Sequence, residues 1–145
     1  DALALFHKLF QHEALVIDKW FALQAGAPDR AGDVLPRVRQ LMQHPDFSLR
    51  NPNRARSLIF SYCSANPAAF HRADAAGYVY WSEQVLALDA INPQVAARLA
   101  RAMDRWSRLA EPYRSAAKVA IERVAAKTDL SNDVREVISR ALSAA

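Results

Sequence analysis

The sequence predicts an all-α protein with about eight helices, stacked as antiparallel pairs in an irregular helical-repeat array. Its 145 residues contain only three glycines, and glycine is the residue that costs a helix interior most after proline. Apolar residues recur at helical spacing along most of the chain. The connections are short, which favours stacked helix pairs over a four-helix bundle. We expect one domain, residues 1–145, because a chain of this length with 52% hydrophobic residues can bury a core.

Two helices are predicted at the start of the chain. Their apolar residues fall at helical spacing over Ala2–Gln11 and His12–Gly26. Gly26 provides a stop signal for the second helix, because glycine commonly follows a helix C-terminus. The predicted core contacts of the second helix are Leu15, Trp20 and Leu23.

The next two predicted helices begin with cap residues. Asp33 is expected to cap a helix over residues 34–44 by accepting a backbone N–H bond, and Pro45 ends it. Asn51 and the proline after it open an amphipathic helix over residues 53–65.

The second half of the chain contains a predicted central helix and three later ones. A short turn over residues 66–72 precedes the helix at 74–91, whose apolar density predicts deep burial. Later helices begin after Asn92, at Pro112 and after Ser131. The apolar residues that predict burial of the central helix are Tyr78, Val79, Trp81, Val85, Leu86 and Leu88.

Asn-Pro pairs start predicted helices at Asn51, Asn66 and Asn92. Asn accepts a backbone N–H bond as a cap, and proline at the first helical position loses no hydrogen bond. The intervals between the three pairs are unequal, so the sequence does not support a strict repeat.

Composition limits the compartment and the class of partner. The single cysteine, Cys63, rules out an internal disulfide and favours the cytoplasm. No apolar run approaches the roughly 20 residues that span a bilayer, and the start does not resemble a signal peptide. The net charge of +4 permits an acidic partner such as nucleic acid without arguing for it. The start at Asp1, without methionine, suggests a processed protein or a piece of a longer one.

Catalytic motifs are incomplete in this sequence. His12-Glu13 resembles the beginning of the zinc-protease motif H-E-x-x-H, but the second histidine is replaced by Val16. His7 does not replace it, because five residues on a helix turn the side chain by about 140°. His44 and His71 are interpreted as capping or surface residues.

Nucleophilic and nucleotide-binding motifs are missing as well. Cys63 lies among apolar residues, where a thiol is expected to be buried and inert. The sequence has no G-x-S-x-G motif, no phosphate-binding glycine loop and no dinucleotide fingerprint. We therefore predict no catalytic residue and no metal ligand within this sequence.

A row of arginines follows Asn92-Pro93. On one continuous helix, the row and Gln94 fall within an arc of about 80°, opposite an apolar face. The residues of this arc are Gln94, Arg98, Arg101, Arg105 and Arg108. We interpret the last three as a solvated face. Gln94 and Arg98 lie one turn apart near the helix start, where a guanidinium can hold a carboxylate through two parallel bonds.

Four stretches together resemble a known family. They read, in chain order, ALVIDKWFALQA, NPNRARSL, NPAAFHRADAAGY and INPQVAARLARAM. In this order they resemble the C-terminal domain of bacterial aminopeptidase N, a cytoplasmic zinc aminopeptidase, and the similarity runs over essentially the whole chain. The resemblance implies an armadillo- or HEAT-like superhelical array that closes over an upstream catalytic domain and controls the access of peptide substrates.

The resemblance also implies where the chemistry lies. The family's zinc, its zinc ligands and its catalytic residues belong to upstream domains, so this part alone is expected to be inactive, with no cofactor of its own and no nucleic-acid or membrane partner. Gln94 and Arg98 match the family residues that face the substrate cavity. Asn51 to Arg54 also match the family pattern, and we interpret them as structural.

A second class of function is compatible with the same helices. A free-standing helical-repeat module can offer its concave surface to a protein or a nucleic acid. Salt-sensitive binding to nucleic acid would support that alternative. A third possibility, an autonomous hydrolase, is disfavoured by the missing ligands.

Overall fold

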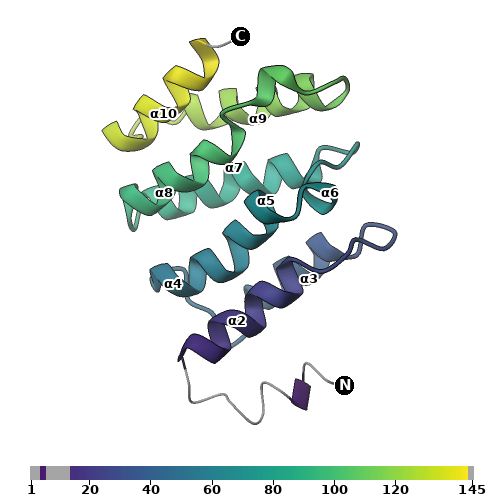
Figure 1. Cartoon of the computed structure of the whole chain (residues 1–145). Coiled ribbons are helices and arrows are strands. Elements are labelled where there is room, and N and C mark those ends of the chain that lie inside the picture. The colour runs from purple at the N-terminus through teal and green to yellow at the C-terminus, as the bar shows by residue number, and fades with distance from the viewer. Residues whose placement is uncertain (1–3, 6–13, 144–145) are drawn as a thin grey trace. The chain divides into compact units, whose positions relative to one another are not determined.

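The computed structural model describes residues 4–5 and 14–143, and all regular secondary structure in this part of the chain is helical (Figure 1). No strand occurs among these residues, so the predicted fold class is confirmed. The chain divides into two compact units, Asp1–Ala69 and Phe70–Ala145. The first predicted helix, Ala2–Gln11, lies largely outside the described residues.

The first unit packs two helices against one longer, composite helix (Figure 1). The two helices are α2 (Ala14–Ala25) and α3 (Val34–Leu41). The composite helix consists of α4 (Pro52–Ala55), the π-helical segment η1 (Arg56–Phe60) and α5 (Ser61–Ala65). It matches the helix predicted over residues 53–65. The short helix α6 (Pro67–Phe70) follows, and the boundary between the units falls within it.

Helix α2 turns a different face to the core from the one predicted. Trp20 is buried as expected, but Leu15 is 81% exposed and Leu23 is 50% exposed. The buried residues are instead Ile17 and Phe21, which lie on the same face as Trp20. The prediction was wrong for the two leucines because apolar residues surround most of this helix, so its periodicity did not define one buried side.

The second unit is built around α7 (Ala76–Asp89). Helices α8 (Pro93–Ala100) and α9 (Tyr113–Ala125) both contact α7, and α10 (Asn132–Ser143) contacts α8 and α9 (Figure 1). The deep burial predicted for the central helix is confirmed for Tyr78, Trp81, Val85 and Leu88, whereas Leu86 is half-buried and Val79 is 37% exposed.

Two buried tryptophans tie these helices together by side-chain hydrogen bonds. The indole N–H of Trp81 on α7 donates to the carbonyl oxygen of Leu99 at 2.9 Å. The indole N–H of Trp106 donates to the carbonyl oxygen of Ala141 on α10 at 2.8 Å. Because a buried indole N–H needs an acceptor, these bonds fix α8 and α10 relative to the segments that carry the rings.

Two of the three Asn-Pro pairs cap helices as predicted. Asn51 accepts a bond from the backbone N–H of Arg54 at 3.2 Å, and Asn92 accepts one from Val95 at 3.3 Å. Ser131 caps α10 in the same way, because its hydroxyl oxygen accepts from the backbone N–H of Val134 at 3.2 Å.

Asn66 has a different role from the predicted cap. Its side-chain amide donates to the carbonyl oxygens of Ala25 and Ala27, both at 2.9 Å. The amide therefore satisfies backbone carbonyls at the C-terminal end of α2, which otherwise have no helical partner. Pro67 still begins α6.

The prediction for Asp33 was also wrong in its bond, although this residue does precede α3. The Asp33 carboxylate accepts from the backbone N–H of Arg30 at 3.0 Å. The first N–H of α3, that of Val34, donates instead to Asp29 at 3.2 Å. The loop before α3 thus supplies the cap from four residues earlier than expected.

The helix that carries the arginine row is shorter than predicted. Helix α8 ends at Ala100 and is followed by two 3₁₀ turns, η2 (Arg101–Met103) and η3 (Trp106–Arg108). Arg105 lies between the turns with φ −102° and ψ 22°, outside the helical region. The predicted arc of five residues therefore holds only as far as Arg101.

No helix in the described part of the chain combines the length and the apolar character needed to cross a membrane.

Candidate functional site

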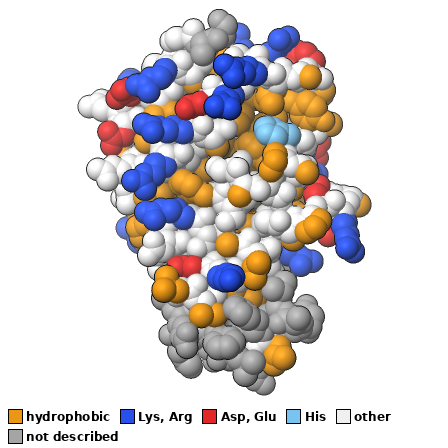
Figure 2. All heavy atoms as spheres, in the orientation of Figure 1, with side chains coloured by type: hydrophobic (Ala, Val, Ile, Leu, Met, Phe, Trp, Pro, Cys, Tyr) orange, Lys and Arg blue, Asp and Glu red, His pale blue; other side chains and the backbone are white. Residues whose placement is uncertain are grey.

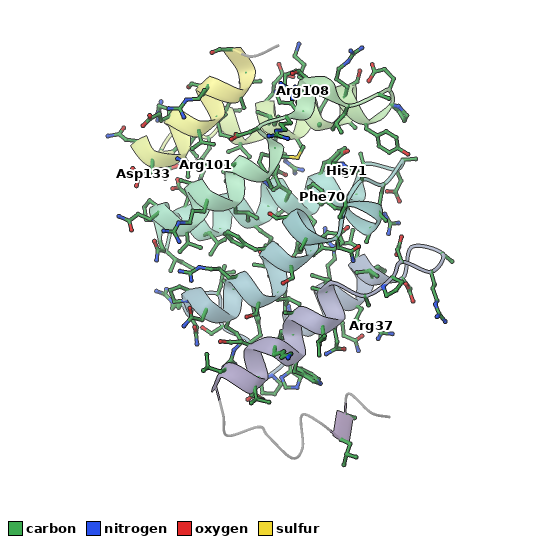
Figure 3. All side chains as sticks on the ribbon, in the orientation of Figure 1. Arg37, Phe70, His71, Arg101, Arg108 and Asp133 are labelled. Carbon is green, nitrogen blue, oxygen red and sulfur yellow. The ribbon has the colours of Figure 1, made fainter. Side chains whose placement is uncertain are left out.

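A groove lies between α8 and α10 in the second unit. Its volume is about 470 Å³. The α8 side, extended by the first residue of η2, faces the N-terminal half of α10, and Figure 3 labels one residue from each side, Arg101 and Asp133. We call this the α8–α10 groove, and its lining residues are Gln94, Ala97, Arg98, Arg101, Asp133, Glu136, Val137 and Arg140.

The cap at Asn92 determines which residues of α8 reach the groove. It starts the helix at Pro93, so Gln94 and Arg98 lie one turn apart on one face. Arg101 follows three residues later on the same side. The opposite face of α8 is buried through Val95 and Leu99, which holds the polar face outward.

Helix α10 presents its polar face to the groove for a similar reason. Val134 and Ile138 are buried, and Val137 is buried while also lining the groove. Asp133 and Glu136 stand on the exposed side at a spacing of three residues. Asp133 is in the first turn of α10, and Glu136 follows one turn later.

Only one ion pair is formed among the groove residues. Arg140 donates to Glu136 at 2.8 Å, with side chains that are 68% and 71% exposed. In the described part of the chain, the side chains of Arg98, Arg101 and Asp133 have no hydrogen bond or ion pair. Two guanidinium groups and one carboxylate therefore remain available to a ligand. Figure 2 shows basic and acidic side chains intermingled on this face.

Sequence reasoning placed Gln94 and Arg98 near each other, and both line the same groove. It interpreted Arg101 as part of a solvated face, and this residue is exposed but also lines the groove. It did not single out Asp133. For Arg101, the available signal was its spacing of three residues from Arg98, which places both on one side of a helix. No signal in the sequence joins Asp133 to α8, because that neighbourhood depends on the packing of two helices.

Arg105 and Arg108 are exposed and are not among the groove residues, as expected for a solvated face. In Figure 3, Arg108 lies away from Asp133, next to α9.

Arg54 forms a closed, structural cluster in the first unit. Its Nε donates to Asp18 Oδ1 at 2.6 Å, and its guanidinium also donates to the carbonyl oxygen of Asp46. The guanidinium carbon lies 5.7 Å from the centre of the Phe21 ring, within the range of a cation–π contact. With 11% of its side chain exposed, Arg54 has its partners inside the fold. The interpretation of this segment as structural agrees with these contacts.

The described histidines make structural contacts. His44 accepts the backbone N–H of Asp46 at 3.0 Å and packs against Trp20. His71 Nδ1 lies 2.6 Å from the Tyr78 hydroxyl, and burial lowers the His71 pKa. Burial also raises the pKa of Tyr78 to about 12, with a smaller contribution from Tyr113.

The remaining catalytic candidates give no site. Cys63 is buried, and its burial raises the thiol pKa well above the usual range, which disfavours the reactive thiolate. His7 and the His12-Glu13 pair lie outside the described residues. The described residues contain no group of three or more His, Cys, Asp or Glu side chains that could hold a metal ion.

Comparison with known proteins identifies the family. A family model described as "Domain of unknown function (DUF3458_C) ARM repeats" matches residues 1–143. The chain belongs to this family. The armadillo-type fold implied by the sequence resemblance is thereby confirmed.

Three curated relatives are bacterial proteins named aminopeptidase N. Those of Caulobacter vibrioides and Haemophilus influenzae are 42% and 44% identical over 97% of this chain. The Escherichia coli protein is 42% identical over 92% of it. The resemblance to the C-terminal domain of aminopeptidase N is confirmed by these matches. The chain spans only 15–16% of the length of these relatives.

A solved structure has the same fold. It is described as the crystal structure of Legionella pneumophila aminopeptidase A in complex with aspartic acid. The TM-score is 0.92 at 29% identity, and the match covers 99% of this chain and 16% of the other.

Proposed function

We propose that residues 1–145 form the non-catalytic C-terminal domain of a zinc aminopeptidase that releases N-terminal amino acids from peptides. The observation that carries the proposal is the 42–44% identity to proteins named aminopeptidase N over nearly all of this chain, against 15–16% of their length. In this view the domain packs on the catalytic domain of the same chain, encloses the substrate cavity and limits access to it.

The zinc of the parent enzyme is proposed to lie outside this chain. The described residues do not fit a zinc site, since they offer no cluster of three potential ligands. We therefore derive no catalytic step from them.

The α8–α10 groove is proposed as the part of this domain that meets the substrate. Arg98 and Gln94 would contact the peptide beyond its cleaved end, and the Arg98 guanidinium would attract the C-terminal carboxylate of a short peptide. Arg98 has no ion-pair partner among the described residues, so its guanidinium is available to a substrate carboxylate, which supports this role.

We place the parent enzyme in the cytoplasm, without a membrane or nucleic-acid partner. A single buried cysteine that requires no oxidising compartment supports this location.

The experiment is an assay of the full-length protein on short peptides and on aminoacyl anilides. We expect stepwise release of N-terminal residues, loss of activity after zinc chelation and recovery on addition of zinc. A full-length protein that releases no amino acid under these conditions would contradict the proposal.

A further inference from the structure

We propose that Arg101 and Asp133, together with Gln94 and Arg98, form a binding site for the C-terminal residue of a peptide substrate. This site prefers a C-terminal residue with a basic side chain. The inference rests on the proposed function and adds a specificity to it. In this arrangement Arg98 and Arg101 share the C-terminal carboxylate, and Asp133 pairs with a lysine or arginine side chain on the same residue.

Not every charged side chain of the groove has a partner within the protein. Arg140 is paired with Glu136 at 2.8 Å. Three charged groups of the groove then have no partner in the described part of the chain: Arg98, Arg101 and Asp133. The available charges are thus two cations and one anion.

The unpaired positive and negative charges lie on opposite walls of the groove. Both cations come from α8 and the start of η2, whereas the anion comes from the first turn of α10. Opposite walls of the groove therefore carry opposite signs. A ligand that satisfies both walls must itself carry an anion beside a cation.

The charges of the groove restrict the kind of ligand that fits it. A simple anion would leave Asp133 facing negative charge, and a simple cation would face two guanidinium groups. The terminal residue of a peptide ending in lysine or arginine carries a carboxylate and a cation on one backbone unit. A groove of about 470 Å³ lies within the range of known ligand pockets, about 300–1,000 Å³.

The geometry of each group suits this use. Arg98 and Arg101 are three residues apart on one side, so their guanidinium groups can approach one carboxylate together. Asp133 lies in the first turn of α10, on the side of the groove opposite Arg98 and Arg101. Gln94, one turn before Arg98, can donate to or accept from the last peptide group.

The test uses the full-length enzyme and two tripeptides that differ only at the last residue, Ala-Ala-Lys and Ala-Ala-Glu. We expect a higher kcat/KM for Ala-Ala-Lys. Asp133→Asn should lower the Lys-to-Glu ratio of kcat/KM by up to about fivefold, the upper end of the range that one exposed ion pair supports. Because the ratio is taken within one protein sample, any loss of folded enzyme cancels.

A second variant tests the carboxylate. Arg101→Gln should raise KM for Ala-Ala-Lys more than for its C-terminal amide, which has no terminal carboxylate. Arg108→Gln is the matched control, because Arg108 is exposed and lies outside the groove. This control should leave both values unchanged.

The outcomes separate this inference from the proposed function. If full-length protein cleaves peptides but Asp133→Asn leaves the Lys-to-Glu ratio unchanged, the specificity inference is wrong and the proposed function stands. If no amino acid is released from any peptide, the proposed function itself has failed. A preference for Ala-Ala-Glu in the unmodified enzyme also overturns the inference.

Discussion

Arg54 and Arg98 follow the same kind of helix start but have opposite surroundings. Each comes within two turns of an Asn-Pro pair whose asparagine caps the helix. Arg54 has an aspartate, a backbone carbonyl and a phenylalanine ring as partners, and only 11% of its side chain is exposed. Arg98 is exposed and forms no ion pair among the described residues.

The difference shows that the neighbouring helix determines whether an arginine near a helix start has an ion-pair partner within the fold. Helix α2 supplies Asp18 to Arg54, which closes that cluster and stabilises the first unit. Helix α10 brings Asp133 and Glu136 toward α8, but Glu136 pairs with Arg140 on its own helix. Arg98 therefore remains available for a ligand. The comparison predicts that loss of Arg54 affects stability, whereas loss of Arg98 affects substrate binding.

The largest expected effect is that of Arg54→Ala on stability. The substitution leaves the Asp18 carboxylate, whose side chain is 14% exposed, without its cationic partner. Removing one member of a buried ion pair costs about 3 kcal/mol. Urea denaturation of the 145-residue chain measures the loss, and Arg50→Ala is the control because Arg50 is exposed. A loss no greater than that of the control would contradict the structural role of Arg54.

A smaller effect separates Asn66 from the two capping asparagines. Asn66→Ala removes two hydrogen bonds, a buried one to the carbonyl oxygen of Ala25 and a part-buried one to that of Ala27, at a cost of about 2 kcal/mol. Asn51→Ala removes one exposed cap bond, which costs about 1 kcal/mol. Thermal or urea unfolding of the two variants should rank them in this order. Equal losses would contradict the larger contribution of the two Asn66 bonds.

The smallest predicted effect is a pH dependence that comes from His71. Burial lowers its pKa in the folded chain below the ordinary value of 6.5, so the unfolded chain binds the proton more tightly. The contribution to stability is complete above pH 6.5 and is lost as the pH falls toward the lower, folded pKa. The free energy of unfolding should decrease between pH 7 and pH 5 in the unmodified chain.

Two variants check this assignment. His71→Gln should flatten the decrease between pH 7 and pH 5. Tyr78→Phe should retain it, because burial rather than the 2.6 Å contact with the Tyr78 hydroxyl is the cause of the lowered pKa. A flat profile in the unmodified chain would contradict the burial argument.

The sequence predicted side-chain hydrogen bonds correctly where both partners lie within a few residues of each other. The caps at Asn51, Asn92 and Ser131 satisfy backbone groups three residues away, so residue type and helix start were enough. Asn66 differs because its partners, Ala25 and Ala27, are about forty residues earlier in the chain. No local pattern reveals such a contact.

The same reasoning separates the two halves of the candidate site. Gln94 and Arg98 share one helix and could be paired by spacing. Arg101 could not be assigned by spacing alone, because it lies after the end of α8 at Ala100. Only the structure shows that the Arg101 side chain still lines the groove. Asp133 required the packing of α10 against α8, which is a tertiary feature. Helical periodicity predicted faces correctly where one side was polar, and failed at Leu15, where the helix was apolar on most sides.

The most direct test of the account is the effect of Arg98→Ala in the full-length enzyme on two substrates, a tripeptide and a single-residue aminoacyl anilide. If the groove meets the peptide beyond its cleaved end, KM for the tripeptide rises more than KM for the anilide, which is too short to reach Arg98. Equal changes in KM for both substrates would contradict the account.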